Sequence, residues 1–483
     1  MIKPASIRVN YFLNLSRVAF STLAGLLTLP YINRVLGVEN IGRVEYVNSI
    51  ITYFILFSAL GIPMYGIREV AKYRNNLELK SKFVIELLII LLITSLISFL
   101  ILFCFVINIG SLKDLKPLIV IMSSMIFLSN IGVEWFYQGI EDQKFITIRF
   151  FIVKISTLIL LFICVKNTDD YLVYGAILVL STVGGNIFNF FNLKNHITLT
   201  NIKIKDLNFK THLKPILTVF VASISVSIYI QLDNLLLGSI AGSKSVGYYT
   251  LANKLVRYVI ILITTVGNVM LPRLSYLIST DRAQYNIYIR KVLNYFLIIA
   301  LPFTVIFFLL AKDFIILMGG KEFLPSVLAM QILSPIIIIV SLAYFIGYLI
   351  LYPQGKELIY TIAVSLSAVF SIVSNFFLIP KYGHTGVAFI AVLSELIGVI
   401  IMIIFYYKEL ILMKLLNKNL LYLLFSTIIM IVSITFISLL KLEPINNILF
   451  STSVGLFLFC ITLILFKEDT ISSVIFEVRN KQY

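Results

Sequence analysis

Residues 251–270 have the sequence LANKLVRYVIILITTVGNVM, a run long and apolar enough to cross the hydrocarbon core of a membrane. The run carries two cations, Lys254 and Arg257, three positions apart. A cation at the centre of a bilayer costs about 2.5 kcal/mol or more, so neither side chain is expected to face lipid. Residues three apart share one face of a helix, and we expect that face to meet protein or water.

The whole chain has the composition of a membrane protein. Of its 483 residues, 60% are hydrophobic and 13% are charged, whereas soluble domains are about half apolar and a quarter charged. The sequence predicts an all-α polytopic membrane protein with about 14 transmembrane helices. The expected spans are residues 11–33, 41–64, 83–108, 117–138, 145–165, 171–193, 215–240, 246–271, 292–311, 326–352, 358–380, 385–407, 419–440 and 446–466.

The placement of Lys and Arg predicts the orientation. With a cytoplasmic N-terminus, the basic segments 67–82, 194–214 and 273–291 all fall on the cytoplasmic side, where such cations accumulate. Both termini are therefore predicted to be cytoplasmic. The net charge of +16 then reflects topology and attraction to anionic lipid, and nucleic acid is not an expected partner.

Motifs for catalysis or nucleotide hydrolysis are missing from the sequence. It has no phosphate-binding G-x-x-x-x-G-K-[ST] loop, and its three histidines, His196, His212 and His384, show no metal-ligand spacing. The longest loop expected outside, 312–326, is too short for a sugar-binding domain. We therefore predict a transporter with no catalytic residue, no metal site and no cofactor.

An internal repeat supports this prediction. LGVENIGRVEYVN (36–48) aligns with AGSKSVGYYTLAN (241–253), and the segments 60–73 and 267–279 follow at the same offset of about 205 residues. Parallel repeats of this kind form two lobes around a central cavity that holds the substrate site. We expect an N-terminal lobe of helices 1–6 at 1–200, a C-terminal lobe of helices 7–12 at 201–407, and helices 13–14 with a cytoplasmic tail at 408–483.

Several segments resemble the bacterial polysaccharide transporter family. These are the O-antigen and capsule repeat-unit flippases of the multidrug/oligosaccharidyl-lipid/polysaccharide flippase superfamily. The resemblance covers about residues 8–410 and includes LPYINRVLGVENIGRVEYVNSIITYFILFSALGIPMYGIREVAK (29–72), GVEWFYQGIEDQKFITIR (132–149), SIYIQLDNLLLGSIAGSKSVGYYTLANKLVR (227–257) and LIPKYGHTGVAFIAVLSEL (378–396).

The resemblance implies a fold and a function. It implies twelve core helices in two lobes, two additional C-terminal helices, and a location in the cytoplasmic membrane of a bacterium. The implied activity is transfer of an undecaprenyl-diphosphate-linked oligosaccharide from the inner to the outer leaflet, with the polysaccharide polymerase machinery as a possible partner. Distant members that flip the peptidoglycan precursor carry cavity arginines in the first and eighth helices, where Arg17 and Arg257 stand here.

Four cations are the candidate substrate-binding residues: Arg17, Lys154, Lys254 and Arg257. Arg and Lys bind diphosphate oxygens through charge-assisted hydrogen bonds. A structural role is the alternative, with Arg257 paired to Asp233 or Arg17 paired to Glu45. Lys154 and Arg149 could instead extend to the lipid headgroups.

Three acids within spans, Asp233, Glu45 and Glu134, are candidate sites of proton or sodium coupling, with structural ion pairs as the alternative. Two other functions stay open. A drug or metabolite antiporter of the same superfamily would more naturally have an acidic pocket, and a membrane polymerase or ligase would need a catalytic acid-base pair outside.

Overall fold

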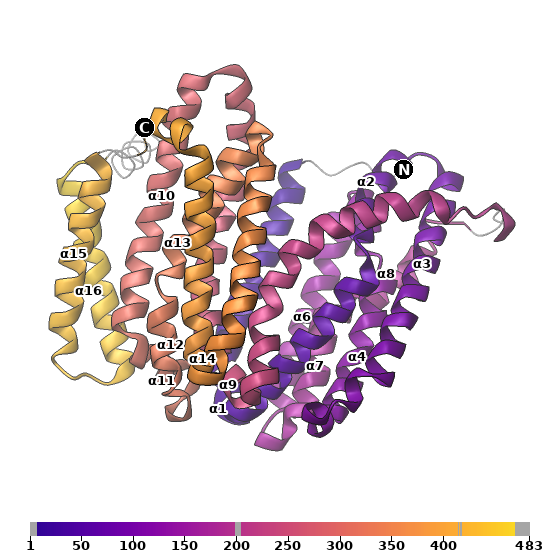
Figure 1. Cartoon of the computed structure of the whole chain (residues 1–483), viewed down its shortest axis with the longest axis horizontal. Coiled ribbons are helices and arrows are strands. Elements are labelled where there is room, and N and C mark those ends of the chain that lie inside the picture. The colour runs from indigo at the N-terminus through magenta and orange to yellow at the C-terminus, as the bar shows by residue number, and fades with distance from the viewer. Residues whose placement is uncertain (1–6, 199–203, 414, 416–417, 469–483) are drawn as a thin grey trace. The chain divides into compact units, whose positions relative to one another are not determined.

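The computed structural model describes residues 7–198, 204–413, 415 and 418–468, and every regular element in these ranges is helical. Residues 469–483 of the predicted cytoplasmic tail lie outside them. The chain forms two compact units, Met1–Gly247 and Tyr248–Tyr483, and Figure 1 shows the long helices of each unit running side by side.

The described part of the first unit contains nine helices, and five of them line the candidate site. They are α1 (Ile7–Ala59), α2 (Ile62–Lys72), α3 (Leu77–Cys104), α4 (Lys116–Ile131), α5 (Glu134–Gly139), α6 (Gln143–Cys164), α7 (Tyr171–Val183), α8 (Gly185–Leu193) and the first part of α9 (Lys210–Thr280). Short helical turns join them: η1 (Val106–Asn108), η2 (Gly110–Leu115), η3 (Thr168–Asp170) and η4 (Ile204–Asp206).

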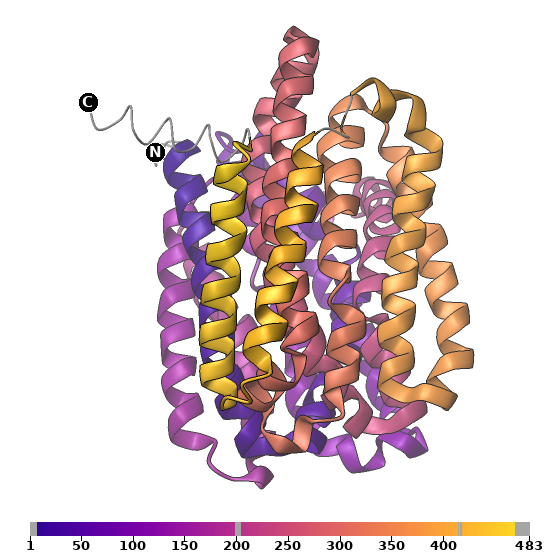
Figure 2. The same ribbon diagram turned by 90° about the vertical axis from the view of Figure 1, so that its left-hand side faces the viewer.

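The second unit begins within α9 and ends in a helical hairpin. Its elements are α10 (Arg282–Leu309), α11 (Ala311–Gly319), η5 (Lys321–Phe323), α12 (Ser326–Leu333), α13 (Ile336–Tyr344), the π-helical turn η6 (Phe345–Leu351), η7 (Tyr352–Gln354), α14 (Glu357–Leu412), α15 (Lys418–Ser438) and α16 (Pro444–Leu465). The last two helices, α15 and α16, pair with each other, and Figure 2 shows them in yellow, side by side. In addition, α15 packs against α10 and α16 packs against α11.

Ten helices in the described part of the chain are long and apolar enough to cross a membrane, or eleven if the bent pair Thr168–Val183 and Gly185–Leu193 is one span. This confirms the predicted all-α, multi-pass membrane class but not the count of fourteen. Three of the ten, Phe12–Ala59, Gln231–Thr280 and Glu357–Leu412, have 48, 50 and 56 residues. At 1.5 Å per residue these measure about 70–85 Å, enough to cross about 30 Å of hydrocarbon twice.

Glycines interrupt all three of these long helices. Gly37, Gly242 and Gly383 have positive φ angles of 72°, 79° and 53°, which glycine adopts at little cost because it has no Cβ. Gly37 and Gly242 also share ψ, at 174° and 171°. They are the equivalent positions of the two repeats, so the repeat seen in the sequence is matched by one backbone conformation.

Exposed aliphatic side chains mark the faces that suit lipid. On α3 they recur along one side, at Leu92, Ile93, Leu96, Ile97, Leu100 and Ile101. Nearer its start α3 also buries Glu86, whose carboxylate Oε2 lies 2.8 Å from His212 Nε2. Tyr65 and His212 are joined by a 2.9 Å hydrogen bond between the phenol and Nδ1. A buried polar cluster of this kind satisfies its own hydrogen bonds and fixes the start of α9.

Candidate anion-binding site

A polar pocket in the first unit brings together two of the four predicted cations. It has a volume of about 250 Å³ and lies between α1, α5, α6, α7 and α8. Arg17 reaches it from α1 and Lys154 from α6, and Arg149 of α6 joins them. The remaining lining residues are Ser21, Glu134, Phe150, Val153, Ser181, Thr182 and Gly185.

Arg149 lies at the centre of the polar contacts around the pocket. Its Nη2 donates to Glu134 Oε2, and its Nη1 lies 3.4 Å from Asn186 Oδ1. The residue is only 8% exposed. Its place near a span end suggested that it extends to the lipid headgroups, but its burial shows that it does not. The reason is Glu134, because a carboxylate inside the membrane fold draws the nearest guanidinium to itself.

Arg17 holds the other side of the same carboxylate. Its Nη1 lies 3.9 Å from Glu134 Oε1, and its Nη2 donates to Gln143 Oε1 at 3.1 Å and to Asn14 Oδ1 at 3.0 Å. The structure therefore pairs Arg17 with Glu134, whereas Glu45 was the partner considered from sequence. Glu134 itself is an ion-pair partner of two arginines, which is the structural alternative to a role in ion coupling.

Lys154 has a different kind of partner. Its Nζ donates to Ser181 Oγ at 2.8 Å, and the side chain lines the pocket instead of leaving it. A hydroxyl leaves the positive charge of the ammonium uncompensated. Lys154 is accordingly the pocket cation that a ligand could neutralise with the least rearrangement.

Two glycines make room for this arrangement. A Cβ on Gly185 would lie 2.4 Å from Arg149 Nη1, and a Cβ on Gly132 would lie 2.1 Å from Asn186 Cγ. Asn186 in turn donates to the Leu128 carbonyl at 2.9 Å, which fixes its amide. The guanidinium can therefore cross the start of α8 only because no side chain stands at Gly185.

The charges of the pocket do not balance. The lining residues carry three cations and one carboxylate, a formal excess of two positive charges. The Nε atoms of Arg17 and Arg149 are also buried with no hydrogen-bond partner. Buried charge without compensation is costly, so the pocket is suited to an anion with several oxygens, such as a phosphate or diphosphate.

The other two predicted cations lie in the second unit. Lys254 and Arg257 are half-buried on one side of α9, together with Asn253 and Tyr258, while Leu255 and Val256 on the other side are buried. Arg257 Nε donates to Asn253 Oδ1 at 3.4 Å. The predicted shared face is present, and its role in binding stays a proposal.

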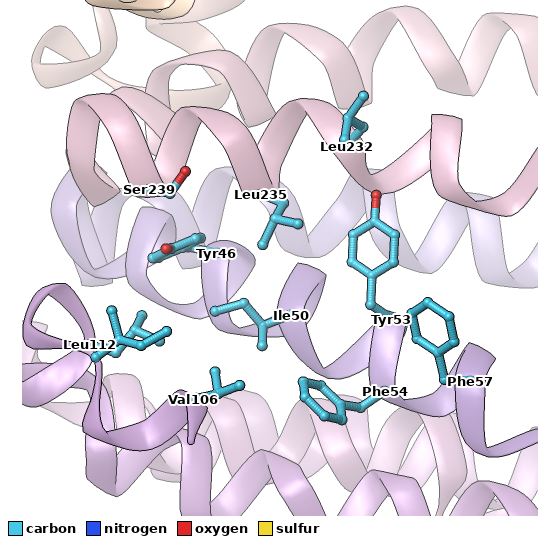
Figure 3. Close-up of a pocket in the computed structure, with 11 residues that line it drawn as sticks. Tyr46, Ile50, Tyr53, Phe54, Phe57, Val106, Leu112, Leu232, Leu235 and Ser239 are labelled. Atoms are coloured by element: carbon cyan, nitrogen blue, oxygen red, sulfur yellow. The ribbon is translucent and has the colours of Figure 1, made fainter. Parts of the chain in front are cut away.

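The two remaining candidate acids lie apart from the anion pocket. Glu45 is buried in α1 at 8% exposure, and Asp233 lies on α9 near the phenol of Tyr53. Between these helices and the η1–η2 segment is an apolar pocket of about 480 Å³. Figure 3 shows its lining, with Ile50, Phe54 and Leu235 turned inward and the Tyr53 hydroxyl toward α9. This second pocket suits hydrocarbon and not a diphosphate.

The sequence matches a known protein family and characterised relatives. Residues 7–278 match the family described as polysaccharide biosynthesis protein. The chain belongs to this family. A protein assigned as an O-antigen transporter in Escherichia coli (strain K12) is 22% identical over 395 residues, 79% of this chain and 92% of its own. The capsular polysaccharide biosynthesis protein CapF of Staphylococcus aureus is 24% identical over 402 residues, 80% of this chain and 96% of its own.

Solved structures show the same fold. The lipid II flippase MurJ in an inward closed conformation matches with a TM-score of 0.74 at 18% identity, over 95% of this chain and 99% of its own. A multidrug resistance MATE family transporter of the MOP superfamily, inward-facing, matches with a TM-score of 0.65 at 14% identity, over 84% and 99%. The fold is that of a flippase and a transporter, and the Escherichia coli relative is named as a transporter, which supports the predicted transporter and not an enzyme.

Proposed function

We propose that this protein is a flippase that moves an undecaprenyl-diphosphate-linked oligosaccharide repeat unit across the cytoplasmic membrane of a bacterium. The direction is from the inner to the outer leaflet, by alternating access, for O-antigen, capsule or exopolysaccharide synthesis. Both termini are cytoplasmic in this scheme, and the polymerase machinery receives the product. The family and the names of the relatives support a polysaccharide-related flippase.

The positive excess of the anion pocket is the observation that carries the proposal. A diphosphate headgroup cannot cross hydrocarbon unless its charge and its hydrogen bonds are satisfied on the way. Arg17, Arg149 and Lys154 supply both, with Glu134 as the one opposing charge. Lys254 and Arg257 supply further positive charge in the second unit. The prenyl tail needs no such help, because it remains in an apolar medium throughout.

The same excess separates the flippase from the antiporter alternative. A pocket for organic cations would be disfavoured by two uncompensated positive charges, because like charges in a low-dielectric site repel strongly. An acidic pocket would be the better design for such a substrate. If the protein were a drug antiporter, it would prefer lipophilic cations, and the positive charge of this pocket disfavours their binding.

Binding of soluble probes tests the proposal. We expect the purified protein to bind farnesyl diphosphate more tightly than farnesyl monophosphate, and tetraphenylphosphonium least. Arg17→Gln and Lys154→Gln should each weaken diphosphate binding about tenfold, because a charge-assisted hydrogen bond contributes about 1.5–3 kcal/mol. Lys154→Gln breaks no ion pair seen in the structure, so it separates lost binding from lost folding.

Arg43→Gln is the matched control, because Arg43 pairs with Glu39 at 3.5 Å and is one-third exposed at its side chain. It should leave diphosphate binding unchanged. Tighter binding of tetraphenylphosphonium than of farnesyl diphosphate would overturn the flippase proposal in favour of the antiporter.

A further inference from the structure

Three tyrosines in the second unit form a stacked row. Tyr344, Tyr348 and Tyr352 stand four residues apart, from the end of α13 through η6 to η7. Their neighbouring ring centroids are 5.2 and 5.3 Å apart, with interplanar angles of 19° and 14°. In an α-helix each step of four residues turns about 40° around the axis, so such side chains would fan out. The π-helical turn rotates less per residue and offsets this drift, and the three rings stay nearly parallel.

The row is the exposed side of an otherwise buried turn. Tyr348 is 36% exposed and Tyr352 is 55% exposed, while the other six residues of η6 are all buried: Phe345, Ile346, Gly347, Leu349, Ile350 and Leu351. Faces that suit lipid look different, since α14 exposes Val369, Val373, Phe376 and Phe377. Here only aromatic rings with hydroxyls are presented. Such a surface suits a ligand that offers both apolar ring faces and hydroxyl groups.

Two glycines leave room for tyrosine rings at this turn. A Cβ on Gly267 of α9 would lie 2.5 Å from the Tyr344 ring, and a Cβ on Gly347 would lie 2.3 Å from the ring of Tyr360. The Tyr344 hydroxyl donates to Asn268 Oδ1 on α9 at 2.6 Å. The first ring of the row is thus fixed against α9, and a fourth tyrosine packs behind the turn. The arrangement holds the rings in place before any ligand binds, which lowers the entropy cost of binding.

The row adjoins the basic face of α9. Positions 254, 257, 261, 264 and 268 follow one another at steps of three and four and therefore share one side of the helix, and each is at least partly exposed. Arg257 and Asn268 are eleven residues apart, about 17 Å along the axis. At the stage of transport when the diphosphate is at Lys254 and Arg257, sugars two or more residues away from it would lie at Asn268 and Tyr344.

We propose that the tyrosine row, Tyr344, Tyr348 and Tyr352, binds the sugar rings of the lipid-linked oligosaccharide. This inference rests on the proposed function. Packing of sugar rings against the exposed parts of the tyrosine rings selects carbohydrate over bare phosphate, and the row of hydroxyls provides partners that can be exchanged as the glycan moves. The row binds the sugars distal to the diphosphate. Its contribution to transport therefore depends on the length of the glycan and not on the headgroup.

Transport of two glycolipids tests the row. Proteoliposomes are loaded with undecaprenyl-diphosphate oligosaccharide extracted from cells that make this protein, or with undecaprenyl diphosphate carrying a single N-acetylhexosamine. Tyr348→Leu and Tyr352→Leu should each slow transfer of the oligosaccharide roughly three- to tenfold, since aromatic stacking contributes about 0.5–1.5 kcal/mol. Transfer of the single-sugar lipid should stay at the wild-type rate. Tyr276→Leu, at an exposed tyrosine of α9 that is not part of the row, is the control.

The possible results separate this inference from the proposed function. If the wild type transfers neither glycolipid, the proposed function fails. If the wild type transfers the oligosaccharide and the leucine variants do so equally well, only the tyrosine row is wrong. Equal slowing of both glycolipids would also overturn the inference, because it would indicate a structural role. Tyr348→Phe keeps the ring and should retain most of the transfer rate.

Discussion

At the scale of single residues, Glu134 decides the charge state of the anion pocket. Its carboxylate holds both Arg149 and Arg17, so an incoming diphosphate competes with it for the same guanidinium groups. We predict that Glu134→Gln binds farnesyl diphosphate about three- to tenfold more tightly, since one opposing charge is gone. The free energy of unfolding should fall by about 1–3 kcal/mol, because the arginines lose their partner. Isothermal titration and thermal unfolding measure the two effects.

Glu141→Gln is the matched control for this substitution. Glu141 follows the same short helix and pairs with Arg74 at 3.3 Å, but it is half-exposed and lies outside the pocket lining. It should change neither quantity by much. Unchanged or weaker diphosphate binding by Glu134→Gln would contradict the role of Glu134 as the internal counter-ion.

His196 makes the stability of the folded protein depend on pH. It follows α8, and its ring packs edge-on against Phe136 and Tyr137. Burial lowers the pKa of His196 from its ordinary value of 6.5; Asp142 opposes this shift and Lys80 adds to it. The folded state then binds a proton less readily than the unfolded state, so stability is complete above about pH 6.5 and falls as the pH drops below it.

Thermal unfolding of the purified protein between pH 8 and pH 5 measures this effect. We expect the midpoint to fall on acidification by more in the wild type than in His196→Gln, which cannot be protonated. An identical fall in both proteins would show that His196 contributes nothing to the pH dependence.

Part of the candidate site could be predicted from the sequence. The cost of charge in a membrane singles out Arg17 and Lys154, and the structure brings both to one pocket. Arg149 was missed as a pocket residue because its nearness to a span end suggested lipid headgroups. The hairpin between α5 and α6 carried a usable signal. Its turn is at 140–142, so Glu134 and Arg149 stand at similar distances on either side and can meet if they face each other.

At the scale of the helices, the start of α8 controls the position of Arg149. A methyl group at Gly185 would lie 2.4 Å from the guanidinium, so Gly185→Ala must push Arg149 away from Glu134. We predict that this variant folds but binds farnesyl diphosphate at least about fivefold more weakly, because the pocket loses an ordered cation. Titration of the purified variant measures the loss.

Gly110→Ala serves as the control, since a Cβ there meets open space. Wild-type diphosphate affinity in Gly185→Ala would show that the position of Arg149 is unimportant.

Hydrophobic runs predicted the helices themselves, because burial in lipid requires apolar length. The π-helical turn at Phe345–Leu351 could not be predicted in this way, because the segment is apolar at nearly every position and an extra residue per turn therefore leaves no visible shift.

At the scale of the whole molecule, the two sequence repeats meet at reciprocal contacts. A Cβ on Gly42 would lie 1.8 Å from the Ser243 carbonyl oxygen, and a Cβ on Gly247 would lie 2.2 Å from that of Val38. Gly42 and Gly247 are equivalent repeat positions, as are Val38 and Ser243. The two turns therefore pack backbone to backbone about an approximate twofold relation, which only glycine permits.

We predict that Gly42→Ala and Gly247→Ala each lower the free energy of unfolding by about 1–3 kcal/mol, the usual cost of forcing extra volume into a packed site. The double variant should lose less than the sum, because the first substitution already opens the shared contact. Thermal or chemical unfolding of the three variants measures the coupling. Strict additivity, or a Gly42→Ala variant as stable as Gly110→Ala, would contradict the reciprocal contact.

The most direct test of the flippase mechanism is the rate at which a diphosphate-linked glycolipid changes leaflet in proteoliposomes. The measurement compares the wild type with Lys154→Gln and Arg17→Gln, and uses Arg43→Gln as the control. We predict transfer by the wild type and by the control, and a loss of about tenfold or more in each pocket variant that still folds. Wild-type rates in both pocket variants would contradict the assignment of the anion pocket as the path of the diphosphate.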